Sequence, residues 1–110
     1  MSNTFDFNKL KKKYMTVILP DENKTTVLVT TPSKATFDSF VNIKNALEDD
    51  NLGDEAINEL YEIIANILNQ NKAHIKFTRE KVSELFDFED IIVFIKAYTT
   101  FIKEVTNQKN

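Results

Sequence analysis

The sequence predicts a mainly α-helical α+β fold, in which an N-terminal β-hairpin is followed by about four helices packed in a small bundle. The chain of 110 residues contains one glycine and two prolines, too few turn-forming residues for a many-stranded β protein. Apolar residues recur at helical spacing over long stretches. The apolar content of 42% and the charged content of 28% are typical of a globular chain. A chain of this length forms a single domain, here residues 1–110.

The first expected elements are two β-strands. The runs YMTVIL (14–19) and TTVLVT (25–30) are rich in β-branched residues. Between them lies PDENK, where Pro20 begins a turn and the side chains of Asp21 and Asn23 bond to local backbone, which predicts a hairpin loop of about five residues. A lone hairpin is marginal in water, so it must pack on the helices or gain a strand. Residues 74–78 (HIKFT) fit either a third strand or an extended connector.

Four helices are expected after the hairpin. The first has apolar positions from 37 to 47, the second covers about residues 54–71, the third is short and ends at 86, and the fourth covers residues 87–105. Acidic residues gather at the start of the second helix, where the helix dipole favours negative charge. The residues placed to cap the first, third and fourth helices are Ser33, Thr78 and Asp87.

The fourth helix carries more apolar surface than one buried face requires. At about 100° per residue its apolar side chains gather into one arc, but Ile92 and Val93 fall outside that arc. Val93 lies among polar positions on the side that should face water. Three further apolar residues exceed the needs of a small core: Ile18, Leu28 and Ile63. Because contiguous exposed apolar patches mark association surfaces, this surplus indicates a protein-binding module.

Residues that carry chemistry are scarce. The chain has no cysteine and one histidine, His74, which leaves no thiolate or multi-histidine metal site and no basis for a serine hydrolase triad. Gly53 is the only glycine, so there is no glycine-rich phosphate loop. Residues 48–59 partly match a calcium loop, but Leu52 stands where an oxygen ligand is needed. We expect neither an enzyme nor a cofactor or metal site.

The net charge of −3 is spread unevenly. Residues 1–13 form an expected flexible basic arm with four lysines, and residues 106–110 an expected flexible tail. Nucleic-acid binding is not expected, because useful affinity needs more neutralised phosphates and base-stacking groups nearby. The chain has neither a secretory signal nor a run of about 18 apolar residues. We therefore expect a cytoplasmic protein with no membrane association.

Several phrases of the sequence occur in a recognisable order. After the lysine-rich start come the hairpin MTVILP…TTVLVTTPSK, the phrase FDSFVNIKNALED, and FTREKVSELFDFEDIIVFIKAYTTFIKEV near the end. In this order they resemble the tail assembly chaperones of long-tailed phages and prophages of Gram-positive bacteria. The resemblance spans nearly the whole chain. It depends on the general pattern and on short phrases such as ELFDFEDII and AYTTFI, with no catalytic motif.

The resemblance implies a non-enzymatic role in virion assembly. Such chaperones bind the long, apolar tape measure protein, keep it soluble and help tail-tube protein subunits polymerise around it. They act in the host cell cytoplasm, are not expected in the mature virion, and tend to form homo-oligomers. A longer form made by ribosomal frameshifting is common in the family, and residues 108–110 (QKN) could be encoded by a slippery, A-rich sequence.

The candidate contact residues come from the surplus apolar positions rather than from any family motif. On the fourth helix and the hairpin they are Ile92, Val93, Phe94, Tyr98, Val27 and Val29. The helix residues would bury apolar segments of the partner, and the hairpin would accept an added strand. The sequence leaves one alternative open, namely a small helical adaptor or inhibitor that binds a single folded protein.

Overall fold

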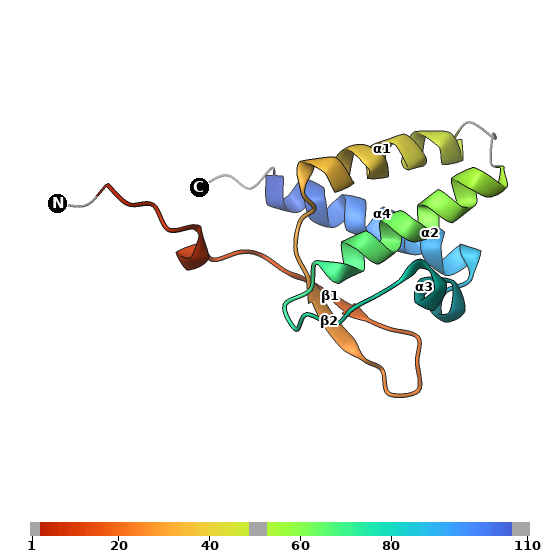
Figure 1. Cartoon of the computed structure of the whole chain (residues 1–110), viewed down its shortest axis with the longest axis horizontal. Helices are drawn as coiled ribbons and strands as arrows, with labels where there is room; N and C mark the ends of the chain where they lie inside the picture. Colours follow the sequence, from red (N-terminus) through yellow and green to blue (C-terminus); the bar gives the residue numbers. More distant parts are fainter. Residues whose placement is uncertain (1–2, 49–52, 107–110) are drawn as a thin grey trace.

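The structure is a computed structural model that describes residues 3–48 and 53–106. As predicted, an antiparallel hairpin precedes four helices (Figure 1). The elements are β1 (Met15–Ile18), β2 (Thr26–Val29), α1 (Lys34–Glu48), α2 (Asp54–Asn69), α3 (Arg79–Leu85) and α4 (Phe88–Thr106), and a short 3-10 turn, Phe7–Lys9, lies before β1. Residues 108–110, which could be encoded by a frameshift sequence, and four residues of the 48–59 loop lie outside the described ranges.

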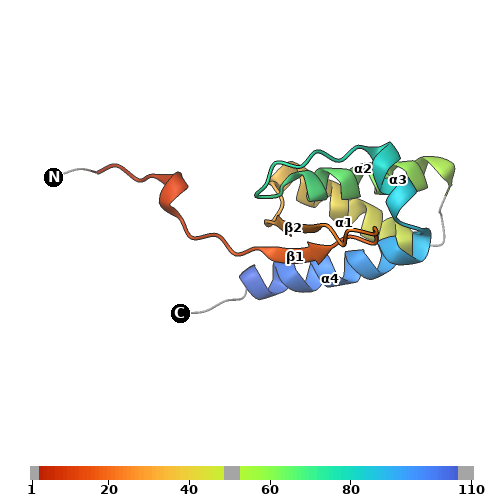
Figure 2. The same cartoon turned by 90° about the horizontal axis from the view of Figure 1, so that it is seen from below.

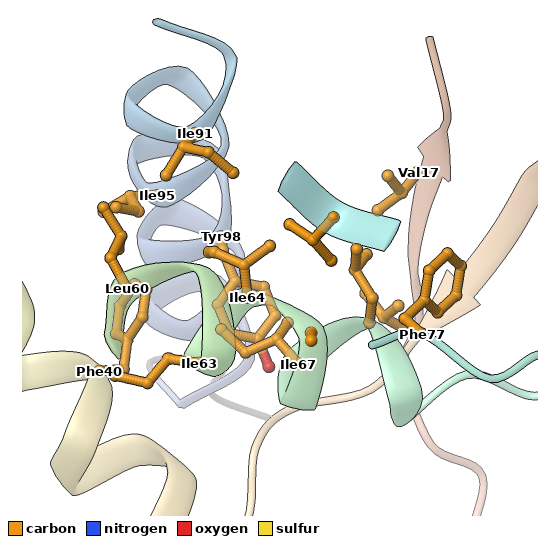
Figure 3. Close-up of a cluster of buried hydrophobic side chains, with 14 of the residues drawn as sticks. Val17, Phe40, Leu60, Ile63, Ile64, Ile67, Phe77, Ile91, Ile95 and Tyr98 are labelled. Atoms are coloured by element: carbon orange, nitrogen blue, oxygen red, sulfur yellow. The ribbon is translucent and has the colours of Figure 1, made fainter. Parts of the chain in front are cut away.

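Helix α2 is the central element of the core. It packs against α1, α3 and β2 (Figure 1). Because neighbours surround it, apolar residues are buried around most of its circumference, including Leu60, Ile63, Ile64, Ile67 and Leu68. Ile63 lies beside Phe40 of α1 (Figure 3) and is 3% exposed. The expectation that Ile63 belongs to a surplus apolar surface is therefore wrong.

The three predicted helix caps are confirmed. The backbone N–H of Lys81 donates to the Thr78 hydroxyl at 3.1 Å, and that of Asp90 donates to the Asp87 carboxylate at 2.8 Å. The Thr36 N–H donates to the Ser33 hydroxyl at 3.3 Å. Each bond satisfies a backbone donor that the first turn of a helix leaves without an internal partner.

Three helix ends differ from the prediction, the smallest difference being that α3 ends at Leu85 rather than at residue 86. Helix α2 ends at Asn69 rather than near residue 71. The Asn69 and Asn71 side chains explain this early end, because both bond to the backbone of the segment that follows. Helix α4 continues to Thr106, so this residue belongs to the helix and not to the expected tail. Its hydroxyl donates to the Ile102 carbonyl at 2.9 Å.

The hairpin loop is held by one carboxylate. Asp21 accepts a hydrogen bond from the Thr25 backbone N–H at 2.8 Å and another from the Thr25 hydroxyl at 2.6 Å. Lys24 takes a left-handed backbone conformation with φ of 50°, which lets the chain reverse within the loop. The pairing that follows sets Val17 opposite Val27 and Met15 opposite Val29, and it directs Val17, Val27 and Val29 into the core.

Residues 70–77 form an extended connector and not a third strand. Asn71 makes an isolated bridge to Val29, and the Lys72 N–H donates to the Leu28 carbonyl at 2.9 Å. The Asn71 side chain is 5% exposed and bonds to the backbone of Leu68 and Ile75. This connector covers the outer edge of β2, so the hairpin is tied to the C-terminal end of α2.

Candidate protein-binding site

The outer edge of β1 is open, whereas that of β2 is covered. The Leu19 N–H donates to the Thr25 carbonyl at 2.8 Å, which makes these two residues a hydrogen-bonded pair of the antiparallel ladder. Because such pairs alternate, the backbone N–H and C=O groups of Thr16 and Ile18 point away from β2. Within residues 3–48 and 53–106 the sheet has only two strands, so no third strand pairs with this edge of β1.

Helix α4 lies alongside this open edge (Figure 2), and a groove of about 400 Å³ separates the two elements. We call it the β1–α4 groove. Phe86, just after α3, also borders it. Its strand wall is formed by Met15, Thr16, Val17, Ile18 and Pro20, and its helix wall by Glu89, Asp90, Val93, Phe94 and Ala97.

The groove combines exposed apolar side chains with acidic groups at one end. Ile18 is 64% exposed and Val93 is 60% exposed, the highest values among the large apolar residues of the described folded body, residues 15–48 and 53–106. Among the described residues, the only charged ones that line the groove are Glu89 and Asp90, both in the first turn of α4. Such a surface suits an extended segment that brings apolar side chains, backbone hydrogen-bonding groups and positive charge.

Asp90 is fixed in place, whereas Glu89 is exposed on the groove wall. Asp90 accepts a hydrogen bond from the Asp87 backbone N–H at 3.1 Å while its own N–H donates to Asp87. Burial, and secondarily the carboxylates of Asp87 and Asp90, raise the pKa of the nearby Tyr61 hydroxyl. The first turn of α4 therefore places two carboxylates, those of Glu89 and Asp90, on the groove wall.

The structure distributes the six predicted contact residues over three environments. Val93 and the partly buried Phe94 line the β1–α4 groove. Ile92 is partly buried and faces a separate apolar pocket of about 260 Å³ between α1 and α4, which Leu47 and Phe88 also line. The remaining three are core residues that are almost fully buried: Tyr98, Val27 and Val29.

The expectation that Tyr98, Val27 and Val29 present their side chains to a partner is corrected by this burial. Tyr98 is surrounded by aromatic rings, with the Phe40 centroid at 5.6 Å and the Phe94 centroid at 5.7 Å (Figure 3 shows its place in the core). Burial raises the pKa of Tyr98 well above its usual value. Val27 and Val29 face inward from the strand whose outer edge the connector covers.

The sequence-based contact set omitted Ile18 and the other groove residues on β1. Strict alternation in the run YMTVIL provides the signal for Ile18, because Val17 and Leu19 point inward and Ile18 must point outward. What alternation alone does not give is the position of α4 next to that edge. The pairing of Ile18 with Val93 across one groove depends on the tertiary arrangement.

Other features of the described residues bear on chemistry and on location. His74, the single histidine, is exposed in the connector with φ of 59°. In the part of the chain that the structure describes, no three histidine, cysteine or acidic side chains are grouped so that they could hold a metal ion. None of the described helices is both long and apolar enough to span a membrane.

Comparison with known proteins gives no assignment: no family model, no curated protein and no solved structure matches this chain. The class that the structure itself defines is a small α+β fold with a hairpin packed on four helices.

Proposed function

We propose that this protein is a non-enzymatic phage or prophage tail assembly chaperone that binds the tape measure protein through the β1–α4 groove. The observation that carries the proposal is the position of Ile18 and Val93, two strongly exposed apolar residues, on the two walls of one groove beside an open strand edge. Exposed apolar surface of this kind is kept in a folded protein where a partner covers it.

The groove offers two kinds of contact to an apolar, extended client. The outward N–H and C=O groups of Thr16 and Ile18 pair with a strand added along β1. Val93, Phe94 and Ala97 on α4 receive the client's apolar side chains. By covering such segments until the tail tube forms around them, the chaperone keeps the tape measure protein soluble in the host cytoplasm.

The proposal is tested by coexpression with the tape measure protein that we expect to be encoded beside this gene. We expect the wild-type chain to shift the tape measure protein into the soluble fraction and to copurify with it. The double variant Ile18→Lys/Val93→Lys should lose both effects, because it places two charges in the apolar part of the groove. The matched control is Ser83→Lys/Thr100→Lys, which adds the same charge at exposed positions that do not line the groove.

Three outcomes would contradict the proposal. The gene neighbourhood could lack a tail-tube gene and a long tape-measure gene. The groove variant could solubilise the tape measure protein as well as the control does. The chain could instead bind one folded protein and leave the tape measure protein insoluble, which would support the adaptor or inhibitor interpretation.

A further inference from the structure

The segment before β1, residues 3–14, is an exposed apolar and basic arm. Every residue from Asn3 to Tyr14 is exposed. Phe5 is 64% exposed, Phe7 is 71% exposed and Leu10 is 47% exposed, and the two phenylalanine rings pack edge to face with centroids 4.8 Å apart. In both views the arm leads away from the helices (Figures 1 and 2). Covering such exposed aromatic residues with another surface lowers the free energy of the system.

The arm complements the β1–α4 groove in charge and in apolar content. It carries four lysines against the single acid Asp6, while the part of the chain that the structure describes lines the groove with Glu89 and Asp90 and with no basic residue. Phe5 and Phe7 are two positions apart, the spacing that places side chains on the same face once the 3-10 turn Phe7–Lys9 opens into an extended strand. The open edge of β1 provides the backbone groups that such a strand needs.

The arm of the same chain is badly placed to fill its own groove. It enters β1 directly at Met15, so it would have to reverse direction within residues 11–14 to lie along the outer edge of β1. These residues are Lys11, Lys12, Lys13 and Tyr14, none of which is a residue that favours tight turns. A tight reversal would also bring three like charges together.

We propose that the arm of a second copy of this chain binds in the β1–α4 groove. Phe5 and Phe7 of the donor copy lie against Ile18 and Val93 of the acceptor, and the donor's lysines lie near Glu89 and Asp90. The inference depends only on the arm and the groove, and it holds whatever the client of the groove is. It assigns the arm a role in self-association that sequence composition, which indicates only a basic terminus, does not reveal.

The absence of cysteine from the chain allows a direct test by disulfide cross-linking. Two full-length single variants, Phe7→Cys and Val93→Cys, are mixed, one of them carrying a size tag so that mixed and like-with-like dimers separate on a gel. Mild oxidation should produce the mixed dimer as the main product. The control replaces Val93→Cys by Ser83→Cys, an exposed position on α3 outside the groove, and should give several-fold less mixed dimer.

A second measurement uses no cysteine. Light scattering on the wild-type chain should give a mass that rises with concentration above the 12.7 kDa of one copy. The full-length variant Phe5→Ser/Phe7→Ser should remain monomeric while keeping its circular dichroism spectrum, because both residues lie outside the core. Val93→Lys should weaken self-association at least about tenfold, the loss expected for one apolar contact and one unfavourable charge.

Two results would overturn the inference. One is a mixed dimer no more abundant than with Ser83→Cys. The other is a double variant Phe7→Cys/Val93→Cys that closes its disulfide within one chain while the mixed single variants do not react, which would place the arm on its own groove. Both experiments are done without the tape measure protein. Failure here therefore leaves the proposed function in place, and failure of client binding leaves this inference in place.

Discussion

The Tyr98 hydroxyl donates a hydrogen bond of 2.9 Å to the backbone carbonyl of Thr30, and this bond joins the middle of α4 to the end of the hairpin. The two residues are 68 positions apart in the chain. Tyr98 is fully buried and Thr30 is half-buried, so the bond is partly shielded from competition with water. It therefore fixes α4 relative to the hairpin, the two elements that form the walls of the β1–α4 groove.

Tyr98→Phe should lower the free energy of unfolding by about 1–2 kcal/mol, because the Thr30 carbonyl loses its partner while the ring packing is kept. Urea unfolding followed by circular dichroism measures this. The matched control is Tyr14→Phe, an exposed tyrosine in the arm, which should leave the stability within about 0.5 kcal/mol of wild type. Equal effects of the two substitutions would show that the hydrogen bond does not hold α4 in place.

Asn71→Ala should be more destabilising than Tyr98→Phe. It should lower the free energy of unfolding by about 2–4 kcal/mol. The Asn71 amide donates to the carbonyls of Leu68 at 2.8 Å and Ile75 at 2.7 Å, and its oxygen accepts from the Ile75 N–H at 2.9 Å. Removing the side chain leaves three backbone groups without partners in a largely buried turn. Thermal unfolding compares it with Asn66→Ala on the exposed side of α2, which should be nearly neutral.

The stability of the hairpin loop should decrease at acid pH. Hydrogen bonds from the Thr25 hydroxyl and from the Thr25 backbone N–H lower the pKa of Asp21 below its usual value of 3.8. A carboxyl whose pKa is lowered by folding stabilises the native state above its unfolded pKa, and this contribution is lost as pH falls through the lowered folded value. NMR titration of the Asp21 carboxyl should give a pKa below 3.8, and Thr25→Val should return it toward that value.

Ile63 and Val93, both assigned by sequence to the surplus apolar surface, should respond differently to truncation. Ile63 is 3% exposed and Val93 is 60% exposed. Ile63→Ala should lower the free energy of unfolding by about 2–4 kcal/mol through lost burial and a cavity, whereas Val93→Ala should change it by less than about 0.5 kcal/mol. Chemical denaturation measures both. A similar cost at the two sites would mean that Val93 is covered in solution, which light scattering at low concentration would then examine.

The sequence predicts the elements of this fold well because its local signals are strong. Ser33, Thr78 and Asp87 each precede a helix, and each side chain makes the capping bond that its type favours. The two β-branched runs separated by PDENK become β1 and β2. These features depend on residues that are only a few positions apart, so the amino-acid sequence alone is enough to predict them.

Tertiary neighbours are what the sequence does not reveal. A helical projection identifies the apolar width of α2, but not that α1, α3 and β2 surround it and bury Ile63. Likewise, the helical pattern of α4 identifies Tyr98 only as one more residue of the apolar arc. No neighbouring residue in the sequence indicates its hydrogen bond to Thr30. The exposed position of Val93 is predicted correctly, because its polar neighbours on the helix surface are local information.

The short length of β1 sets how long any strand stays in the groove. Only Thr16 and Ile18 direct their backbone groups outward, so an added strand gains at most about four backbone hydrogen bonds, each worth about 0.5–1.5 kcal/mol net. So few hydrogen bonds give a weak complex. Because differences in affinity between related complexes lie mostly in the rate of dissociation, a weak complex of this kind dissociates quickly. A four-residue edge therefore favours brief binding and repeated rebinding over permanent capture. This suits a binding surface that must release the bound strand.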